Sequence, residues 1–272
     1  MEEKLNIKDK YTEARFLVMF LTVIPYHGIF AALFIELLES FTLWFWFLGI
    51  HFFVVLFMCV FGDDINIFSI GARSKKEFMN DEKHVIELFD EILAVCKSKN
   101  INCPYSLYII DEKNISAFAM SNQIVISRMA LDSLEDEELK GLIAHEIGHL
   151  HNSSCGFMRF ISGSVFIGSL AVNLYKYSSS NILTHFLFFC LPYYFKVVSS
   201  HYFRINEFYA DEVAVKLGYG EGLMSTLNKL YQFDMRKPSS IDRLTMTHPP
   251  TAIRIVEIEK LLENTSDADI QP

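Results

Sequence analysis

The residues best suited to chemistry are His145, Glu146 and His149, which stand in the order His-Glu-Ile-Gly-His. The segment that leads into them, from Leu134 onward, has the apolar spacing of a helix and contains no proline. Residues four apart on a helix lie on one face, so both imidazoles can reach a single metal ion. Glu146 projects beside them, where its carboxylate could take a proton from a water held by the metal. The pattern predicts a zinc hydrolase site that still lacks one protein ligand.

The third ligand must come from elsewhere in the chain. An extended site, with a third histidine six residues after the second, would need glycine at 152 and histidine at 155, where the chain has Asn152 and Cys155. A glutamate on a later helix is the other solution, and Glu207 is the candidate. Glu207 and Asp211 are four apart and face the same way, so Glu207 could bind the metal while Asp211 accepts a ring N–H from a ligand histidine. Spacing alone leaves a solvated acidic face as the alternative.

The composition indicates a membrane protein with a modest globular part. Of 272 residues, 51% are hydrophobic and 25 are phenylalanine, and the mean hydropathy is +0.24, which is more apolar than ordinary soluble domains. The formal net charge of -9 and the lack of a basic stripe with interleaved aromatics argue against a nucleic-acid partner. The five cysteines form no Cys-x-x-Cys pair, so we expect free thiols in a reducing compartment and no cysteine-ligated zinc.

Two long apolar runs near the start of the chain, Phe16–Leu38 and Phe41–Phe61, are each long enough to cross a bilayer as a helix. The first is too long for the apolar part of a signal peptide and has no small-residue cleavage site, so no cleavable signal is expected. Lysine and arginine flank the outer ends of the pair, whereas the turn between the runs carries only Glu36 and Glu39. By the positive-inside rule both outer ends, and hence His145 and its neighbours, face the cytoplasm.

Two further apolar runs, Phe157–Tyr177 and Ile182–Val198, follow the histidine pattern. They contain polar residues, among them Asn173 and His185, and are less clean than the first pair. A hairpin buried inside the soluble domain is one interpretation. We favour a second membrane hairpin, because tyrosine and phenylalanine crowd its ends and basic residues flank it.

The remainder of the chain alternates between helical and strand-like periodicity. Asp132-Ser133-Leu134-Glu135 resembles an N-cap with a carboxylate three residues on, and we expect it to open the helix that carries His145. The other expected helices are Lys76–Lys99, Ile205–Leu217, Gly222–Phe233 and Thr251–Glu263, and the expected strands are Tyr105–Ile110, Ser116–Met120 and Gln123–Ser127.

The expected fold class is therefore α+β and mainly helical. We expect an integral membrane protein with two transmembrane hairpins and a zincin-like catalytic domain, in which a small β-sheet accompanies the His-Glu-x-x-His helix. The corresponding segments are a cytoplasmic N-terminus 1–15, a transmembrane hairpin 16–61, a first catalytic part 62–155, a second hairpin 156–198, a second catalytic part 199–263 and a flexible tail 264–272.

Several motifs in one order resemble the HtpX-like membrane zinc metalloendopeptidases, over roughly Ile109–Ile255. Each motif by itself is moderately specific, and their shared order together with the paired apolar runs makes the resemblance specific. The motifs are Asn114–Ala119, Asp136–Leu139, His145–His149, Asn206–Asp211 and Thr247–Pro250 with Arg254.

The resemblance implies a multi-pass protease of the bacterial inner (plasma) membrane with a cytoplasmic active site and one zinc ion per chain. It also implies that Glu207 is the third ligand and that membrane or misfolded proteins are the substrates. His248 would lie near the site, where a donor could stabilise an oxyanion, and a turn residue before two prolines is the alternative. Arg254 would either anchor that turn to acidic residues beside the site or lie at the surface.

A protein substrate is expected to lie extended against the strand Ser116–Met120, which we predict to be a sheet edge where main-chain hydrogen bonds hold many sequences. Ser116, Ala117, Phe118 and Ala119 would contact it, with Phe118 lining a pocket or belonging to the core. The alternative function is a catalytically silent zinc-binding membrane sensor or scaffold. Glu146 argues against that alternative, because a structural zinc site would not need it.

Overall fold

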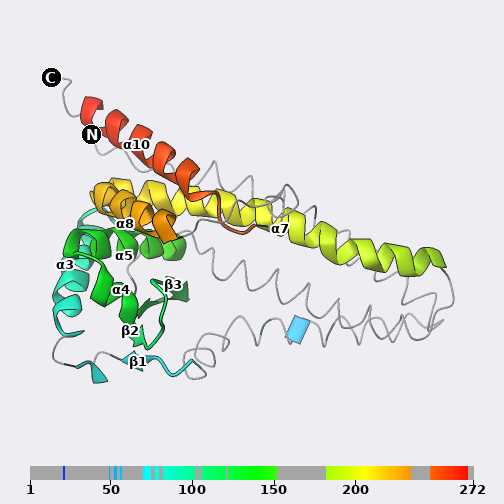
Figure 1. Ribbon diagram of the computed structural model, residues 1–272, viewed down its shortest axis with the longest axis horizontal. Coiled ribbons are helices and arrows are strands. Elements are labelled where there is room, and N and C mark those ends of the chain that lie inside the picture. The colour runs from blue at the N-terminus through cyan, green and yellow to red at the C-terminus, as the bar shows by residue number, and fades with distance from the viewer. Residues whose placement is uncertain are drawn as a thin grey trace. The chain divides into compact units, whose positions relative to one another are not determined.

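A computed structural model describes residues 21, 49, 52, 53, 56, 70–74, 77–79, 82–101, 104, 106–120, 122–151, 182–233 and 246–268 (Figure 1). The chain divides into two compact units. One comprises Met1–Gly62, Gly156–Ile205 and Ser239–Thr247, and the other comprises Asp63–Cys155, Asn206–Pro238 and His248–Pro272. Most of the first unit lies outside the described residues, whereas the second unit contains every predicted site residue.

The second unit contains a four-stranded sheet of order β1-β2-β4-β3. The strands are β1 (Arg73–Ser74), β2 (Ser106–Ile110), β3 (Ala117–Met120) and β4 (Gln123–Ser127). β2 and β4 are parallel, and the other two pairs are antiparallel. Ile124, Val125 and Ile126 of β4 are fully buried, so both faces of this central strand are covered. Among the described strands β3 lies at an edge of the sheet, as the sequence predicts. The sequence does not predict β1, because two residues are too few to show a strand periodicity.

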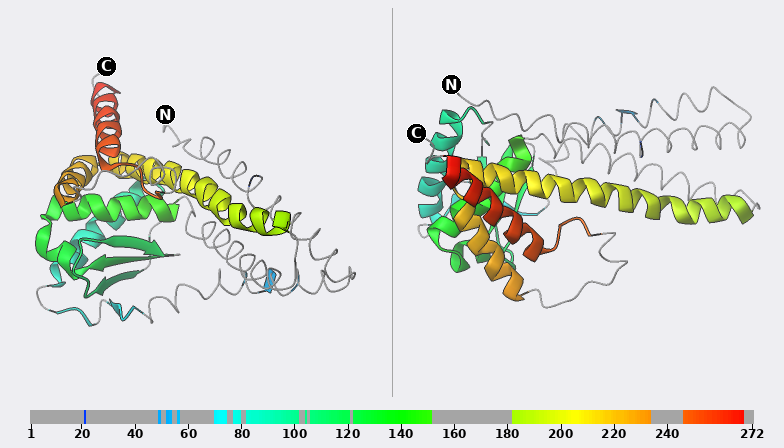
Figure 2. Two further views of the ribbon diagram at one scale, coloured as in Figure 1. Left: turned by 45° about the vertical axis from the view of Figure 1, so that its right-hand side comes forward. Right: turned by 90° about the horizontal axis from the view of Figure 1, so that it is seen from above.

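The helix that carries the histidine pattern is α5 (Asp136–His151), which lies along one face of the sheet (Figure 2). Ile143 and Ile147 of α5 are fully buried. On another side α5 packs against α8 (Gly220–Phe233), and the two backbones approach closely, because a Cβ at Gly141 would lie 2.1 Å from the backbone nitrogen of Leu223. Only glycine fits this crossing, which holds α5 between the sheet and α8.

The start of α5 differs from the prediction. Asp132 belongs to a separate short helix, α4 (Arg128–Ser133), whose N-cap is Ser127; the Ser127 hydroxyl accepts a hydrogen bond from the Ala130 backbone N–H. The expected cap at Asp132 is therefore wrong. The capping contact forms one turn later, where the backbone N–H of Glu135 donates to Glu138 Oε2 at 2.8 Å. Serine and aspartate both favour caps, and the sequence does not show that Ser127 begins a short separate helix before the longer one.

Three other helices begin or end elsewhere than expected. α3 (His84–Ser98) starts later than Lys76, α7 (Ile182–Leu217) is a single helix with no break before Ile205, and α10 (Thr251–Ala268) continues into the predicted flexible tail. The sequence between Val198 and Ile205 has no glycine or proline to end a helix, which explains the continuity of α7. α10 packs on α8, as Figure 1 shows.

Mainly helical structure with a small sheet is confirmed. The hairpin 16–61 and the run Phe157–Tyr177 fall almost wholly outside the described residues. Among the helices that are described, none is both long and apolar enough to cross a membrane. The transmembrane hairpins therefore stay predictions from the sequence.

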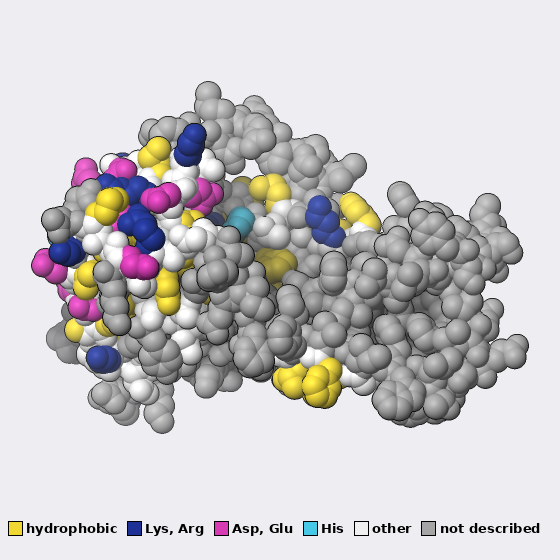
Figure 3. Space-filling model, turned by 90° about the horizontal axis from the view of Figure 1, so that it is seen from below, with side chains coloured by type: hydrophobic (Ala, Val, Ile, Leu, Met, Phe, Trp, Pro, Cys, Tyr) yellow, Lys and Arg dark blue, Asp and Glu magenta, His cyan; other side chains and the backbone are white. Residues whose placement is uncertain are grey.

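On the face shown in Figure 3, acidic and basic side chains are interspersed over the described part of the surface. Among the described residues, several charged side chains form pairs between elements. Lys140 of α5, for example, contacts Glu91 of α3 at 2.9 Å and Glu137 of its own helix at 3.0 Å. Charges paired in this way fix neighbouring helices to one another, and each exposed pair contributes little to stability.

Candidate metal centre

The close approach of α5 and α7 brings the predicted ligands together. A Cβ at Gly148 would lie 2.6 Å from the Cα of Ala210, so the two helices touch along their backbones. This contact places His145 and His149 of α5 opposite Glu207 of α7. One ligand atom from each of the three residues lies within 4.8 Å of the others.

The ring nitrogens that face Glu207 are the Nε2 atoms. His145 Nε2 lies 3.6 Å from Glu207 Oε2, and His149 Nε2 lies 3.4 Å from Glu207 Oε1. The imidazole rings are 4.7 Å apart and nearly perpendicular, at 83°. Two imidazole nitrogens and one carboxylate oxygen form a donor set that zinc accepts in catalytic sites.

One oxygen atom of Glu207 lacks a hydrogen-bond partner among the described residues. Glu207 Oε2 is buried and makes no hydrogen bond within the described structure, although Arg254 Nη1 lies 2.9 Å away as an ion pair. A buried carboxylate oxygen that makes no hydrogen bond can accept a further partner beside the guanidinium, and the two histidine Nε2 atoms lie on the same side of it. The residues present thus fit a bound metal ion.

Asp211, the predicted partner of a ligand histidine, does contact one. Its Oδ1 lies 2.9 Å from His145 Nδ1, the ring nitrogen that faces away from Glu207. Arg254 binds both carboxylate oxygens of Asp211, from Nε at 2.9 Å and from Nη2 at 2.6 Å. Arg254 is 8% exposed, so of its two predicted alternatives the surface position is excluded. It joins the first turn of α10 to the acidic residues of α7.

His248 also lies at the cluster. Its Nδ1 is 3.1 Å from Glu207 Oε1, while 69% of its side chain is exposed. It therefore offers one nitrogen to the site and the rest of its ring to solvent. Glu146, between the two ligand histidines in sequence, is buried at 5% exposure.

The electrostatics keep Glu207 and Asp211 ionised. Burial alone would raise the pKa of Glu207, but hydrogen bonds from His149 and His248 and the charge of Arg254 hold that pKa well below its usual range. Burial likewise opposes ionisation of Asp211, and the charge of Arg254 outweighs it, so the pKa of Asp211 is also lowered. Glu207 is consequently a carboxylate anion at neutral pH.

Asn206 belongs to one of the motifs of the resemblance, and the sequence predicts no role for it. Its side chain is 2% exposed and its amide nitrogen lies 3.4 Å from His149 Nδ1. A polar residue next to a ligand glutamate on the same helix was the available signal, because a helix that supplies a ligand often supplies the partners of other ligands as well.

The predicted substrate strand is only partly available. Ser116 is already paired with Ser127, which donates its backbone N–H to the Ser116 carbonyl at 2.9 Å and accepts the Ser116 N–H through its hydroxyl at 3.0 Å. Ala117, Phe118 and Ala119 lie in the edge strand β3 and are half-buried. β3 also packs against α5, so the strand and the histidines belong to one region of the unit.

Comparison with known proteins identifies one family and several similar proteins. The family model for peptidase family M48 matches residues 80–262. Protease HtpX of Wigglesworthia glossinidia brevipalpis is 27% identical over 230 residues, which cover 70% of this chain and 77% of that protein. A protease HtpX homolog of Methylacidiphilum infernorum is 25% identical over 256 residues, which cover 76% of this chain and 85% of that protein.

A solved structure shares the fold. The crystal structure of S. mikatae Ste24p matches with a TM-score of 0.57 at 17% sequence identity, covering 93% of this chain and 66% of that one. At this identity the likeness concerns the fold alone, and the chain spans about two thirds of the length of that protein.

Proposed function

The chain belongs to peptidase family M48 and is an HtpX-like metalloprotease, and from this premise we propose that it is a zinc-dependent endopeptidase acting on membrane or misfolded proteins. The observation that carries the proposal is the convergence of His145, His149 and Glu207, with ligand atoms within 4.8 Å of one another. These three residues would hold one zinc ion per chain and leave a fourth position open.

A zinc ion in this position would polarise the substrate carbonyl and make a water molecule more acidic. Glu146, beside the ligands on α5, takes a proton from the attacking water and passes it to the leaving amine, the work of a general base and then a general acid. His248, 3.1 Å from Glu207 and largely exposed, is placed to donate a hydrogen bond to the oxyanion.

Asp211 and Arg254 position this machinery. Asp211 accepts the Nδ1–H of His145 and so leaves Nε2 for the metal. The two hydrogen bonds from Arg254 fix the Asp211 carboxylate and keep it from adding an unbalanced charge to a buried site.

The substrate would add to the sheet beside β3. Opposite residues in an antiparallel pair alternate between hydrogen-bonded and non-bonded, and the bond from Ser127 N to Ser116 O makes that pair a bonded one. Ala117 is the next residue along, so its N–H and C=O point away from β4. We therefore assign Ala117 and Ala119, which share this main-chain orientation, to main-chain contact with the substrate, and Phe118 between them to a side-chain contact.

The proposed location is a bacterial inner (plasma) membrane, with the active site on the cytoplasmic side. The support is the pair of apolar runs within 16–61 and the lysine and arginine residues at its outer ends. The lipid bilayer would then be a partner of the chain and would bring membrane substrates close to the site. Deleting 16–61 should lower cleavage of membrane substrates more than cleavage of a soluble unfolded protein; equal effects on both would contradict this placement.

The decisive experiment is proteolysis of an unfolded model protein by the detergent-purified chain, comparing Glu146→Gln with the wild type after matched zinc loading. Glu137→Gln, the same change at an exposed position of α5, is the control. We expect Glu146→Gln to lose activity by about 10²–10⁴-fold with zinc retained, and the control to be unaffected. Equal zinc without cleavage by either protein would favour the silent sensor or scaffold, and absence of zinc in the wild type would contradict the proposal.

A further inference from the structure

The two ligand histidines are held in corresponding ways. In each, Nε2 faces Glu207 and Nδ1 faces another polar side chain of α7. His145 Nδ1 meets Asp211 at 2.9 Å, and His149 Nδ1 meets the amide of Asn206 at 3.4 Å. One helix therefore supplies both the third ligand and a partner for each imidazole.

The chemistry of imidazole decides what that partner must do. A neutral imidazole that binds a metal through Nε2 carries its proton on Nδ1, so the partner of Nδ1 has to accept a hydrogen bond. Asp211 can only accept. Asn206 can accept through Oδ1 but not through Nδ2, which is the atom nearest His149 in the structure. A half-turn of the amide exchanges the two atoms without moving the backbone, since the two ends have nearly the same shape.

We propose that Asn206 is a positioning residue that holds His149 for metal binding, with its Oδ1 accepting the Nδ1–H of that ring. The inference rests on the proposed zinc site and goes beyond its ligand set. Asn206 is 2% exposed, so water cannot readily replace it as acceptor. Its side chain is neutral, so it orients the second histidine without bringing a further negative charge into a site that already buries Glu207 and Asp211.

The test measures zinc affinity of the full-length, detergent-purified chain by competition with a chromophoric chelator, and the rate of zinc loss to EDTA. Asn206→Leu keeps the approximate size of the side chain and removes the acceptor, whereas Asn206→Asp keeps only acceptors. We expect Asn206→Leu to bind zinc about 10–100-fold more weakly and to release it faster, and Asn206→Asp to stay within about threefold of the wild type.

A matched control removes a buried hydrogen bond elsewhere in the same unit. Thr226 of α8 is fully buried and donates to the carbonyl of Glu138 at 2.9 Å, and Thr226→Val should leave zinc affinity within about threefold of the wild type. Thermal unfolding of the metal-free proteins separates a loss of affinity from a loss of fold. If Asn206→Leu does not fold, Asn206→Asp still decides, because a tenfold loss of affinity in that variant contradicts an accepting role.

The possible failures are distinguishable. Wild-type zinc binding with Asn206→Leu unchanged, or with Asn206→Asp as weak as Asn206→Leu, overturns the role of Asn206 and leaves the zinc site standing. A wild-type chain that binds no zinc overturns the proposed function, and the inference with it.

Discussion

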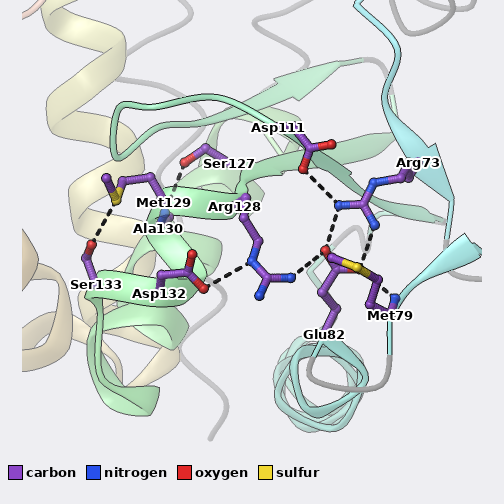
Figure 4. A network of polar contacts seen from close by, with 10 residues as sticks. All are labelled: Arg73, Met79, Glu82, Asp111, Ser127, Arg128, Met129, Ala130, Asp132 and Ser133. Atoms are coloured by element: carbon purple, nitrogen blue, oxygen red, sulfur yellow. Dashed lines mark hydrogen bonds and ion pairs between the residues drawn. The ribbon is translucent and has the colours of Figure 1, made fainter.

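Two buried glutamates of the same unit, Glu82 and Glu207, differ in how completely hydrogen bonds and arginine side chains satisfy their carboxylate oxygens. Glu82 is 1% exposed and lies just before α3. Figure 4 shows it between two guanidinium groups: Arg73 donates to its two oxygens at 2.7 and 2.6 Å, and Arg128 donates at 2.9 Å. The backbone N–H of Met79 adds a bond of 2.7 Å. Both oxygens of this carboxylate have hydrogen-bond partners.

Glu207 is also buried, at 6% exposure, but only one of its oxygens has hydrogen-bond partners in the described part of the chain, and Arg254 contacts the other as an ion pair at 2.9 Å. Its Oε2 makes no hydrogen bond in the described structure, and its neighbours include two imidazole Nε2 atoms. The comparison teaches how to tell the two uses of a buried carboxylate apart. The Glu82 cluster is electrostatically complete and joins β1, α4 and the start of α3, whereas the Glu207 cluster has room in its ligand set for the proposed zinc ion.

The largest expected effect separates the two glutamates by zinc binding. Glu207→Gln replaces an anionic ligand by a neutral amide, so zinc affinity should fall by more than about a hundredfold and metal-dependent proteolysis should be lost. Glu82→Gln is the matched change at the complete cluster and should leave zinc affinity within a few-fold. Chelator competition on both purified variants measures this difference. Equal losses in the two variants would mean that the clusters are not independent.

For the stability of the fold, the larger loss is expected from the change at Glu82. Glu82→Gln leaves two guanidinium groups facing a neutral amide, and removing one member of a buried charged cluster costs about 3–5 kcal/mol. The midpoint temperature of thermal unfolding of the zinc-free Glu82→Gln variant should therefore fall by roughly 6–15 °C. Glu207→Gln, measured in the same way without zinc, should shift the midpoint less, because its partner Arg254, 2.9 Å away, keeps both oxygens of Asp211 after the change. A larger shift for Glu207→Gln would reverse the assignment of the two roles.

The pH dependence of stability gives an independent measure of the complete cluster. Despite its burial, the hydrogen bonds from Arg73, Met79 and Arg128 lower the pKa of Glu82 from 4.5 to about 2. Because the folded-state pKa is below the unfolded one, the stabilisation is fully present above pH 4.5 and is lost as the pH falls towards 2. The shift corresponds to about 3 kcal/mol.

Other carboxylates also titrate in this range, so the quantity to measure is a difference. The gap in unfolding midpoint between the wild type and Glu82→Gln should narrow as the pH falls from 4.5 to 2, because the glutamine variant has no proton to bind at this position. A gap that stays constant over that range would show that the carboxylate is not held ionised by the two arginines.

The sequence predicts these two clusters very unequally. The sequence predicts His145 and His149 because two ligands four residues apart lie on one face of a helix. Glu207 lies on another helix, and its role as third ligand is predicted by the resemblance to the HtpX-like proteases. Glu82, Arg73 and Arg128 come from separate elements with no fixed spacing, and nothing in the order of residues marks them. A local periodicity can be predicted from a sequence, but a contact between charged residues that are far apart in the sequence cannot.

Errors in the element boundaries have the same origin. The strands β2, β3 and β4 are predicted to within one residue because β-branched and aromatic runs are bounded by turn residues, whereas β1 is not predicted. The division between α4 and α5 is missed, since Asp132 and Glu135 both suit a helix start and only tertiary packing selects between them. Asn206 is missed because its role depends on the position of a ring on another helix.

The smallest expected effect concerns the outer members of the complete cluster. Asp111 contacts Arg73 at 3.1 Å and is 74% exposed, so Asp111→Asn should cost less than about 1 kcal/mol, and less again at high salt. Asp132→Asn, at an exposed partner of Arg128, is the matched control and should behave alike. Thermal unfolding at low and high ionic strength measures both. If Asp111→Asn lowers the unfolding midpoint as much as Glu82→Gln does, the solvent-exposed contacts stabilise the cluster. If the loss is small and decreases further at high salt, the buried carboxylate of Glu82 stabilises it, because water does not compete there for the arginines.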